Sequence, residues 1–171
     1  MGESPFLNTI DFVFINPHDP KYDEYSRLMA KHLQPVIIRN VADMVRFVLG
    51  EVSRTGKNIR GITFVGHAGN GELWIGDEIV SVTTLWLTRV GGKDQKPHGP
   101  ELIKLNRYFA PDAYARFLQC NCAYYTDSMR LLSLTWPGVR VTAWTGKIQA
   151  DEDGFDEEGT FVACRMGGCR D

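Results

Sequence analysis

The stretch RGITFVGHAGNG, residues 60–71, decides the fold. An apolar, β-branched run typical of a buried strand leads into His67, which stands among glycines. A second stretch of the same form, YARFLQCNCA at residues 114–123, leads into Cys120, 53 residues after His67. Open α/β sheets place their chemistry just beyond the carboxyl ends of their parallel strands. The sequence therefore predicts that neighbouring strands deliver His67 and Cys120 to one crevice.

Strand-like and helix-like segments alternate along the chain. Apolar runs predict strands at 10–15, 36–38, 60–66, 114–118, 139–144 and 160–163, and amphipathic segments predict helices at 22–33, 41–54, 100–109 and 127–134. Residues 72–75 and 78–82 are expected to form a small hairpin after the histidine, and 90–99 and the acidic run 150–159 to be loops. The alternation predicts an α/β fold, a doubly wound, mostly parallel sheet flanked by helices in a three-layer sandwich.

Length and composition indicate a single domain over residues 1–171, with 43% hydrophobic and 23% charged residues. The net charge of −2 and the pI near 6.1 argue against a nucleic-acid surface and a polybasic membrane patch. The chain has no run of 18 apolar residues that predicts a membrane-spanning helix. The first residues show no secretory signal and the four cysteines are too few for a disulfide scaffold. We therefore expect a cytoplasmic setting, or delivery as part of a larger effector or toxin.

His67 and Cys120 are residue types suited to nucleophilic catalysis. A neutral imidazole is the usual general base near pH 7, and a thiolate is a strong nucleophile when a cation or a helix N-terminus lies nearby. Cys122 competes for the role, but Cys120 comes first after the apolar run. Taken singly, each residue also has a simpler interpretation, with His67 capping a strand and Cys120 packing as a small hydrophobe.

Three other features predict sites. The four cysteines suggest a zinc site as an alternative, although the spacings Cys120-x-Cys122 and Cys164-x4-Cys169 differ from those of zinc knuckles, and the second pair can instead close a small disulfide. The acidic run 150–159 is a solvated loop by default, a cation site, or one wall of a pocket for a basic side chain. Trp144, at the end of a predicted strand, is a candidate for lining a substrate pocket.

The two stretches resemble the caspase-like clan of cysteine peptidases, which includes caspases, legumain, gingipains, separase and the self-cleaving domains of bacterial toxins. The likeness rests on GHAG at 66–69 and on FLQCNCAYY at 117–125, and covers roughly residues 10–163. The second block is similar to those toxin domains and to a bacterial family without an assigned function. Caspases place their histidine about 50 residues before the cysteine, which agrees with the spacing here.

The resemblance implies a peptidase with a Cys/His dyad, acting on a protein or peptide without a cofactor or metal. Cys120 would attack the scissile carbonyl, His67 would protonate the leaving amine, and backbone N–H groups of Cys120 and of Ala68 or Gly69 would hold the oxyanion. The pocket for the residue cut would lie at 144–159, where Trp144 and carboxylates such as the Asp151 and Asp153 side chains favour a basic residue.

The sequence departs from the family pattern at two positions. Ala68 stands where most members have glycine, and Gln119 stands where a small residue precedes the nucleophile. A catalytically inactive caspase-like binding module is therefore an alternative to the peptidase, beside a zinc-stabilised α/β domain that binds a small ligand.

Overall fold

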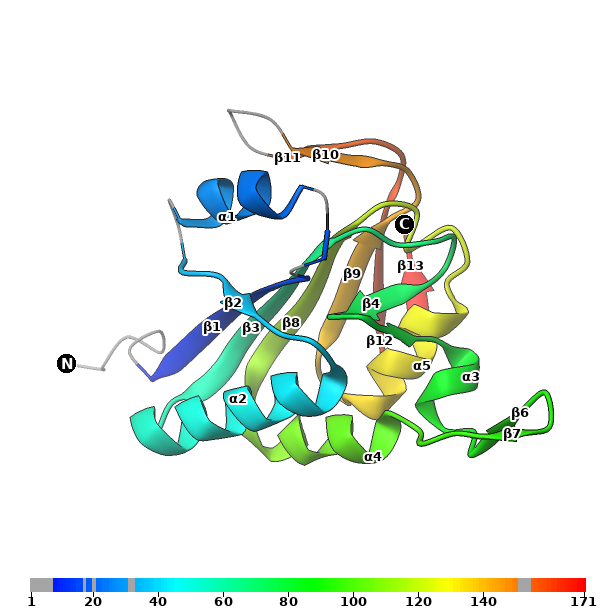
Figure 1. Cartoon of the computed structure of the whole chain (residues 1–171). Helices are drawn as coiled ribbons and strands as arrows, with labels where there is room; N and C mark the ends of the chain where they lie inside the picture. Colours follow the sequence, from blue (N-terminus) through cyan, green and yellow to red (C-terminus); the bar gives the residue numbers. More distant parts are fainter. Residues whose placement is uncertain (1–7, 17, 20, 31–32, 151–154) are drawn as a thin grey trace.

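The computed structural model of the chain describes residues 8–16, 18–19, 21–30, 33–150 and 155–171. Within these residues a seven-stranded sheet has the order β13-β12-β9-β8-β3-β1-β2 (Figure 1). Its strands are β1 (Thr9–Ile15), β2 (Val36–Ile37), β3 (Asn58–Gly66), β8 (Phe109–Gln119), β9 (Arg140–Trp144), β12 (Phe161–Arg165) and β13 (Gly168–Arg170). Strands β2, β1, β3, β8 and β9 are parallel to one another, whereas β12 and β13 are antiparallel to their neighbours. The expected mostly parallel α/β sheet is confirmed.

The central strands pack through a row of aromatic rings. Phe64 of β3 stacks on Phe14 of β1 and on Phe117 of β8, with ring centroids 5.9 and 4.7 Å apart. Successive side chains of a strand point to opposite faces, so this row also defines which face holds the main core. On the opposite face Val65 and Leu118 belong to a second, smaller core.

The helices are divided unequally between the two faces (Figure 1). They are α1 (Tyr22–Ala30), α2 (Val41–Thr55), α3 (Val82–Leu85), α4 (Gly99–Leu102), the 3-10 helix η1 (Ile103–Tyr108) and α5 (Asp127–Thr135). Helices α2, α4 and α5 contribute Met44, Leu102 and Leu132 to the main core. On the other face α1 packs Tyr25 and Leu28 against the carboxyl ends of the strands. Helices therefore flank the sheet on both sides, but the third layer covers only part of its face.

Helix α2 has the apolar stripe and the end residues that its sequence predicts. Its apolar stripe is buried, and the Asn40 side chain accepts a hydrogen bond of 2.8 Å from the Asp43 N–H at its first turn. It ends at Gly56, whose φ of 67° is the left-handed conformation that glycine adopts readily and whose N–H donates to Val52 O.

Three small hairpins project from the strand ends and loops. They are β4 (Leu73–Ile75) with β5 (Glu78–Val80), β6 (Arg89–Val90) with β7 (Lys93–Asp94), and β10 (Ile148–Ala150) with β11 (Phe155–Glu157). The first was expected. The prediction of loops at 90–99 and 150–159 was wrong only in part: short strands at 93–94 and 155–157 interrupt these segments, and their polar and acidic composition gave no sign of strands. Residues 151–154 lie outside the described residues. The last strand also extends further than expected, since β12 turns back into β13.

Candidate active site

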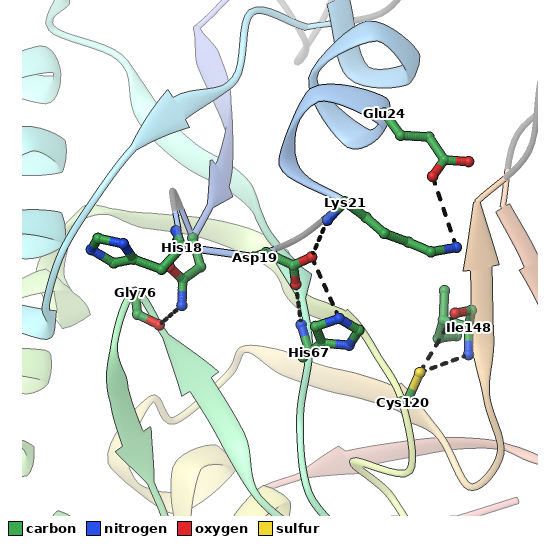
Figure 2. A network of polar contacts seen from close by, with 9 residues as sticks. His18, Asp19, Lys21, Glu24, His67, Gly76, Cys120 and Ile148 are labelled. Carbon is green, nitrogen blue, oxygen red and sulfur yellow. Dashed lines mark hydrogen bonds and ion pairs between the residues drawn. The ribbon is translucent and has the colours of Figure 1, made fainter.

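His67 follows the last residue of β3 and lies beside the loop after β1. Its main-chain N–H donates a hydrogen bond of 2.7 Å to Asp19 Oδ2, and its ring Nε2 lies 3.6 Å from Asp19 Oδ1 (Figure 2). The preceding Gly66 has a φ of 150°, a conformation that favours glycine. The imidazole is 59% exposed. The end of β3 thus fixes the histidine backbone on a carboxylate and leaves its ring accessible.

Asp19 is a site residue that sequence reasoning missed. Its carboxylate is only 1% exposed and accepts hydrogen bonds from the N–H groups of His67 and, at 2.8 Å, of Lys21. Hydrogen bonds to an ionised group are about twice as strong as neutral ones, so they hold this side chain firmly. The signal that could have found it is strand order. Because β1 neighbours β3, the loop after β1 ends next to His67, at the point where the order of the sheet reverses.

Cys120 directly follows β8, the strand on the other side of β3. Gly66 and Gln119 are partners in the β3–β8 register, so His67 and Cys120 leave the sheet from adjacent positions, and Figure 2 draws both at this end of the sheet. The half-buried sulfur accepts a hydrogen bond from the Ile148 N–H at 3.3 Å and lies 3.5 Å from Ile148 O. Among the described residues the sulfur thus bonds to β10, and it makes no hydrogen bond to the imidazole.

The surroundings of Cys120 are mostly apolar. The thiol packs against the smaller core, together with four half-buried side chains: Tyr22, Met29, Trp144 and Phe155. Tyr25 of α1 belongs to the same small core. Burial raises the pKa of its hydroxyl, and the nearby charges of Asp19 and Cys120 add to the shift. Trp144, expected to line a substrate pocket, is therefore in the same cluster as the thiol.

Cys122 has the properties of a packing residue. It is fully buried, and its thiol lies 3.4 Å from Gln119 Oε1. Burial raises the pKa of this thiol well above its ordinary range, with the nearby Cys120 and Glu72 adding to the effect. A thiol that stays protonated and sealed from solvent is a poor nucleophile. Cys120 therefore remains the candidate nucleophile.

Gln119 links the nucleophile strand to the hairpin that follows the histidine. Its buried amide accepts the Trp74 N–H at 3.0 Å and donates to Trp74 O at 2.7 Å. Because the side chain turns toward β4, it does not crowd the thiol, as the residue before a nucleophile can. Two further bonds join the loops, from Gly71 N–H to Asn121 O at 3.0 Å and from the buried Ser128 hydroxyl to Gly71 O at 2.8 Å.

The loop after His67 offers donors for an oxyanion. Within the part of the chain that the structure describes, the N–H groups of Ala68 and Gly69 have no hydrogen-bond partner. A side chain at position 69 would meet the Glu72 carboxylate, which accepts a bond of 3.2 Å from the Trp74 indole. Glycine at this position keeps the main chain open to an approaching group.

A small hollow lies on the side of the histidine. Its volume is about 150 Å³, and its lining residues are Asn16, His18, Asp19, His67, Ala68 and Trp74. Its size suits a small side chain or a leaving group rather than a whole ligand. A larger hollow of about 560 Å³ runs along β1 and β2, and its lining includes Tyr22 but neither His67 nor Cys120.

The remaining predicted sites have different outcomes. Asp151 and Asp153 lie outside the described residues. Cys164 and Cys169 form a disulfide across the β12–β13 hairpin, which takes two of the four thiols from the zinc alternative. Among the described residues no group of three or more His, Cys, Asp or Glu side chains has the arrangement of a metal site.

Comparison of the chain with protein-family models, curated proteins and solved structures finds no match. In the described part of the chain no helix is both long and apolar enough to span a membrane. The arguments for a function accordingly come from the residues and contacts above.

Proposed function

We propose that the chain is a cysteine peptidase of the caspase-like kind, with Cys120 as nucleophile and His67 as acid and base. The proposal rests on the register of β3 and β8. Because of this register the two residues leave the sheet side by side, next to the buried Asp19. The order of the five parallel strands, β2-β1-β3-β8-β9, is the order 2-1-3-4-5 of doubly wound sheets with a site at the switch point.

The reaction proceeds by acyl transfer to sulfur. The thiol first leaves Ile148 and gives its proton to His67, and the thiolate attacks the scissile carbonyl carbon. The tetrahedral oxyanion is held by the N–H groups of Ala68 and Gly69, and a single such donor contributes about 10²–10³ in rate. His67 then protonates the amine as the C–N bond breaks, which leaves a thioester. Water, deprotonated by His67, attacks the thioester and releases the acid and the thiol.

Asp19 is a positioning residue in this mechanism. Its carboxylate fixes the His67 main chain by a hydrogen bond and stabilises the imidazolium through its charge, 3.6 Å from Nε2. This is the role that a third group plays beside many nucleophile–base pairs.

The side chains beside the thiol favour cleavage after an apolar residue. Tyr22, Met29, Trp144 and Phe155 are half-buried against the same small core as Cys120, and each presents apolar surface. Cleavage after a basic residue, which the acidic run favours, depends on carboxylates at 151 and 153 and is kept as the second specificity to test.

An inactive binding module is the second candidate function. It is favoured by the bonds of the Cys120 sulfur to Ile148 and by the ring of His67 facing Asp19 instead of the thiol.

Labelling of the thiol separates the two candidates. The chain is treated with peptidyl chloromethyl ketones that end in leucine, phenylalanine, arginine or lysine, and the adduct is located by peptide mass spectrometry. We expect modification of Cys120, fastest with the apolar ketones, and loss of it in Cys120→Ala and His67→Ala. The matched control Cys122→Ala should react like the natural chain. Absence of a Cys120 adduct at every pH from about 5 to 9 would refute the peptidase and leave the binding module.

A further inference from the structure

We propose that the face of the sheet opposite α2, α4 and α5 binds single-stranded nucleic acid. Arginines from five strands gather there, and this surface is called the arginine face below. Its members are Arg60 of β3, Arg116 of β8, Arg140 of β9, Arg165 of β12 and Arg170 of β13. The proposal is independent of the peptidase chemistry, since none of these residues belongs to the site around Cys120.

Strand alternation places the side chains of four of these arginines, those of β8, β9, β12 and β13, on one face. A register shift at Ile59–Gly61 interrupts the alternation in β3, and Arg60 is placed by its ion pair with Asp11, which interacts with Tyr114 of β8. In β8 Ala115 and Phe117 point into the main core, so Arg116 between them points the other way. In β9 Val141 is in the main core, which sends Arg140 to the same side as Arg116.

The C-terminal hairpin follows the same rule. Cys164 and Cys169 are register partners that pack with the main core, so Arg165 and Arg170 point to the opposite face. Four strand spacings of about 4.8 Å separate β3 from β13, so the arginine face is roughly 19 Å wide. A strip of this width can contact a short stretch of an extended polymer along its whole length, whereas a single ion would contact only a small part of it.

Positive charge predominates on this strip. Arg60 is paired with Asp11, and Arg165 lies 3.4 Å from the exposed Asp112 carboxylate. Neither Arg140 nor Arg170 forms an ion pair with a described residue, and both are exposed at the surface. The cations thus exceed the carboxylates, which favours an anionic partner.

Aromatic side chains lie on the same face, and they favour an anion that carries flat rings able to stack on them. Tyr114 is the register partner of Arg140, and the Arg116 guanidinium lies 5.6 Å from its ring centroid. Phe161 of β12 is 44% exposed and packs edge to face with Trp144, with ring centroids 4.9 Å apart. Phe161 thus offers an exposed ring and Tyr114 a half-buried one. Proteins hold single strands with rings beside arginines, since bases stack on rings and phosphates bind guanidinium groups.

Other anions use only part of this surface. An acidic peptide or a free polyphosphate pairs with guanidinium groups but has no flat base to stack on Phe161 or Tyr114. A duplex hides its bases, so it also leaves the rings without a partner. The net charge of −2 averages over the molecule and conceals this local excess of arginine. The proposal therefore departs from the expectation, based on net charge alone, that nucleic acid is no partner.

Fluorescence anisotropy with a fluorescein-labelled 12-nucleotide oligo(U) or oligo(dT) tests the proposal. Binding should weaken with salt, and Arg116→Gln/Arg140→Gln should lower the slope of log K against log salt by about 0.7 for each phosphate that the variant no longer neutralises. Arg46→Gln/Arg54→Gln, which removes the same charge from exposed positions on α2, is the matched control and should leave the slope unchanged. Phe161→Ala should weaken oligonucleotide binding about 5- to 100-fold.

Three results would overturn the inference. The first is no oligonucleotide binding at low salt up to about 100 µM protein, the weak end of non-specific affinities. The second is an equal reduction of affinity in the arginine-face and α2 double variants. The third is binding of inositol hexakisphosphate, a poly-glutamate peptide or anionic vesicles at least as tight as the oligonucleotide and unaffected by Phe161→Ala. Circular dichroism confirms that each variant is folded, and Cys120→Ala should bind like the natural chain.

Discussion

Replacing Asp19 by asparagine separates the structural from the catalytic part of the site. The carboxylate accepts two main-chain N–H groups, from His67 at 2.7 Å and Lys21 at 2.8 Å. An amide of the same shape has one acceptor oxygen, so one of these donors would face an NH2 group instead. A hydrogen bond to a charged group contributes about 1.5–3 kcal/mol. We expect Asp19→Asn to lower the free energy of unfolding by about 2–3 kcal/mol.

The effect on reactivity follows from the 3.6 Å between Oδ1 and Nε2. Two unit charges at this distance interact by about 1 kcal/mol in water and about 5 kcal/mol at an effective dielectric constant of 20. Because the imidazole is 59% exposed, solvent screening puts the value near the lower limit, about 1–2 kcal/mol. The rate of Cys120 modification by the best ketone should therefore fall about 5- to 30-fold.

Urea unfolding measures the loss of stability. The second-order rate constant of ketone labelling measures the loss of reactivity, at a temperature where both the variant and the natural chain are folded. Asp23→Asn is the matched control, because Asp23 is an exposed aspartate in the first turn of α1. If Asp19→Asn behaves like Asp23→Asn in both assays, Asp19 neither supports nor positions His67, and the positioning role proposed for Asp19 is wrong.

Three further predictions concern the surroundings of the site. Gln119→Leu removes two buried hydrogen bonds to Trp74 and should cost about 2–4 kcal/mol in urea unfolding and slow Cys120 labelling, whereas the exposed Gln149→Leu should change neither. Reduction of the disulfide between Cys164 and Cys169 opens a six-residue ring and should lower stability by about 2 kcal/mol; an unchanged melting temperature with and without reductant would contradict this. The unfolding free energy should fall as pH rises above about 8.5, because Cys122 ionises in the unfolded chain but, with its raised pKa, stays protonated when folded. Urea titrations at successive pH values should show this slope, and Cys122→Ala should flatten it.

The sequence was most informative where a pattern and a spacing coincide. The apolar runs before His67 and Cys120 predicted β3 and β8, and their adjacency in the sheet followed from the order of the elements. Asn40 and the stripe of α2 predicted that helix almost to the residue. These features depend on local chemistry that a single sequence displays.

The rest depends on contacts between distant segments. Asp19 is one aspartate in a loop, and only the pairing of β1 with β3 brings it to His67. The direction of the Gln119 side chain is set by its bonds to Trp74, 45 residues earlier in the chain. The acidic composition around Phe155 concealed β11, whose ladder with β10 includes the backbone of Ile148 beside the thiol. No local pattern carries such information.

The bond from the Gly71 amide to Asn121 O ties the histidine loop directly to the cysteine loop. Asn121 itself has a φ of 56°, a conformation that asparagine tolerates better than most residues. An amide hydrogen held in this way exchanges with solvent only when the two loops separate. The rate of deuterium uptake at the Gly71 amide therefore reports how often the loops of His67 and Cys120 separate.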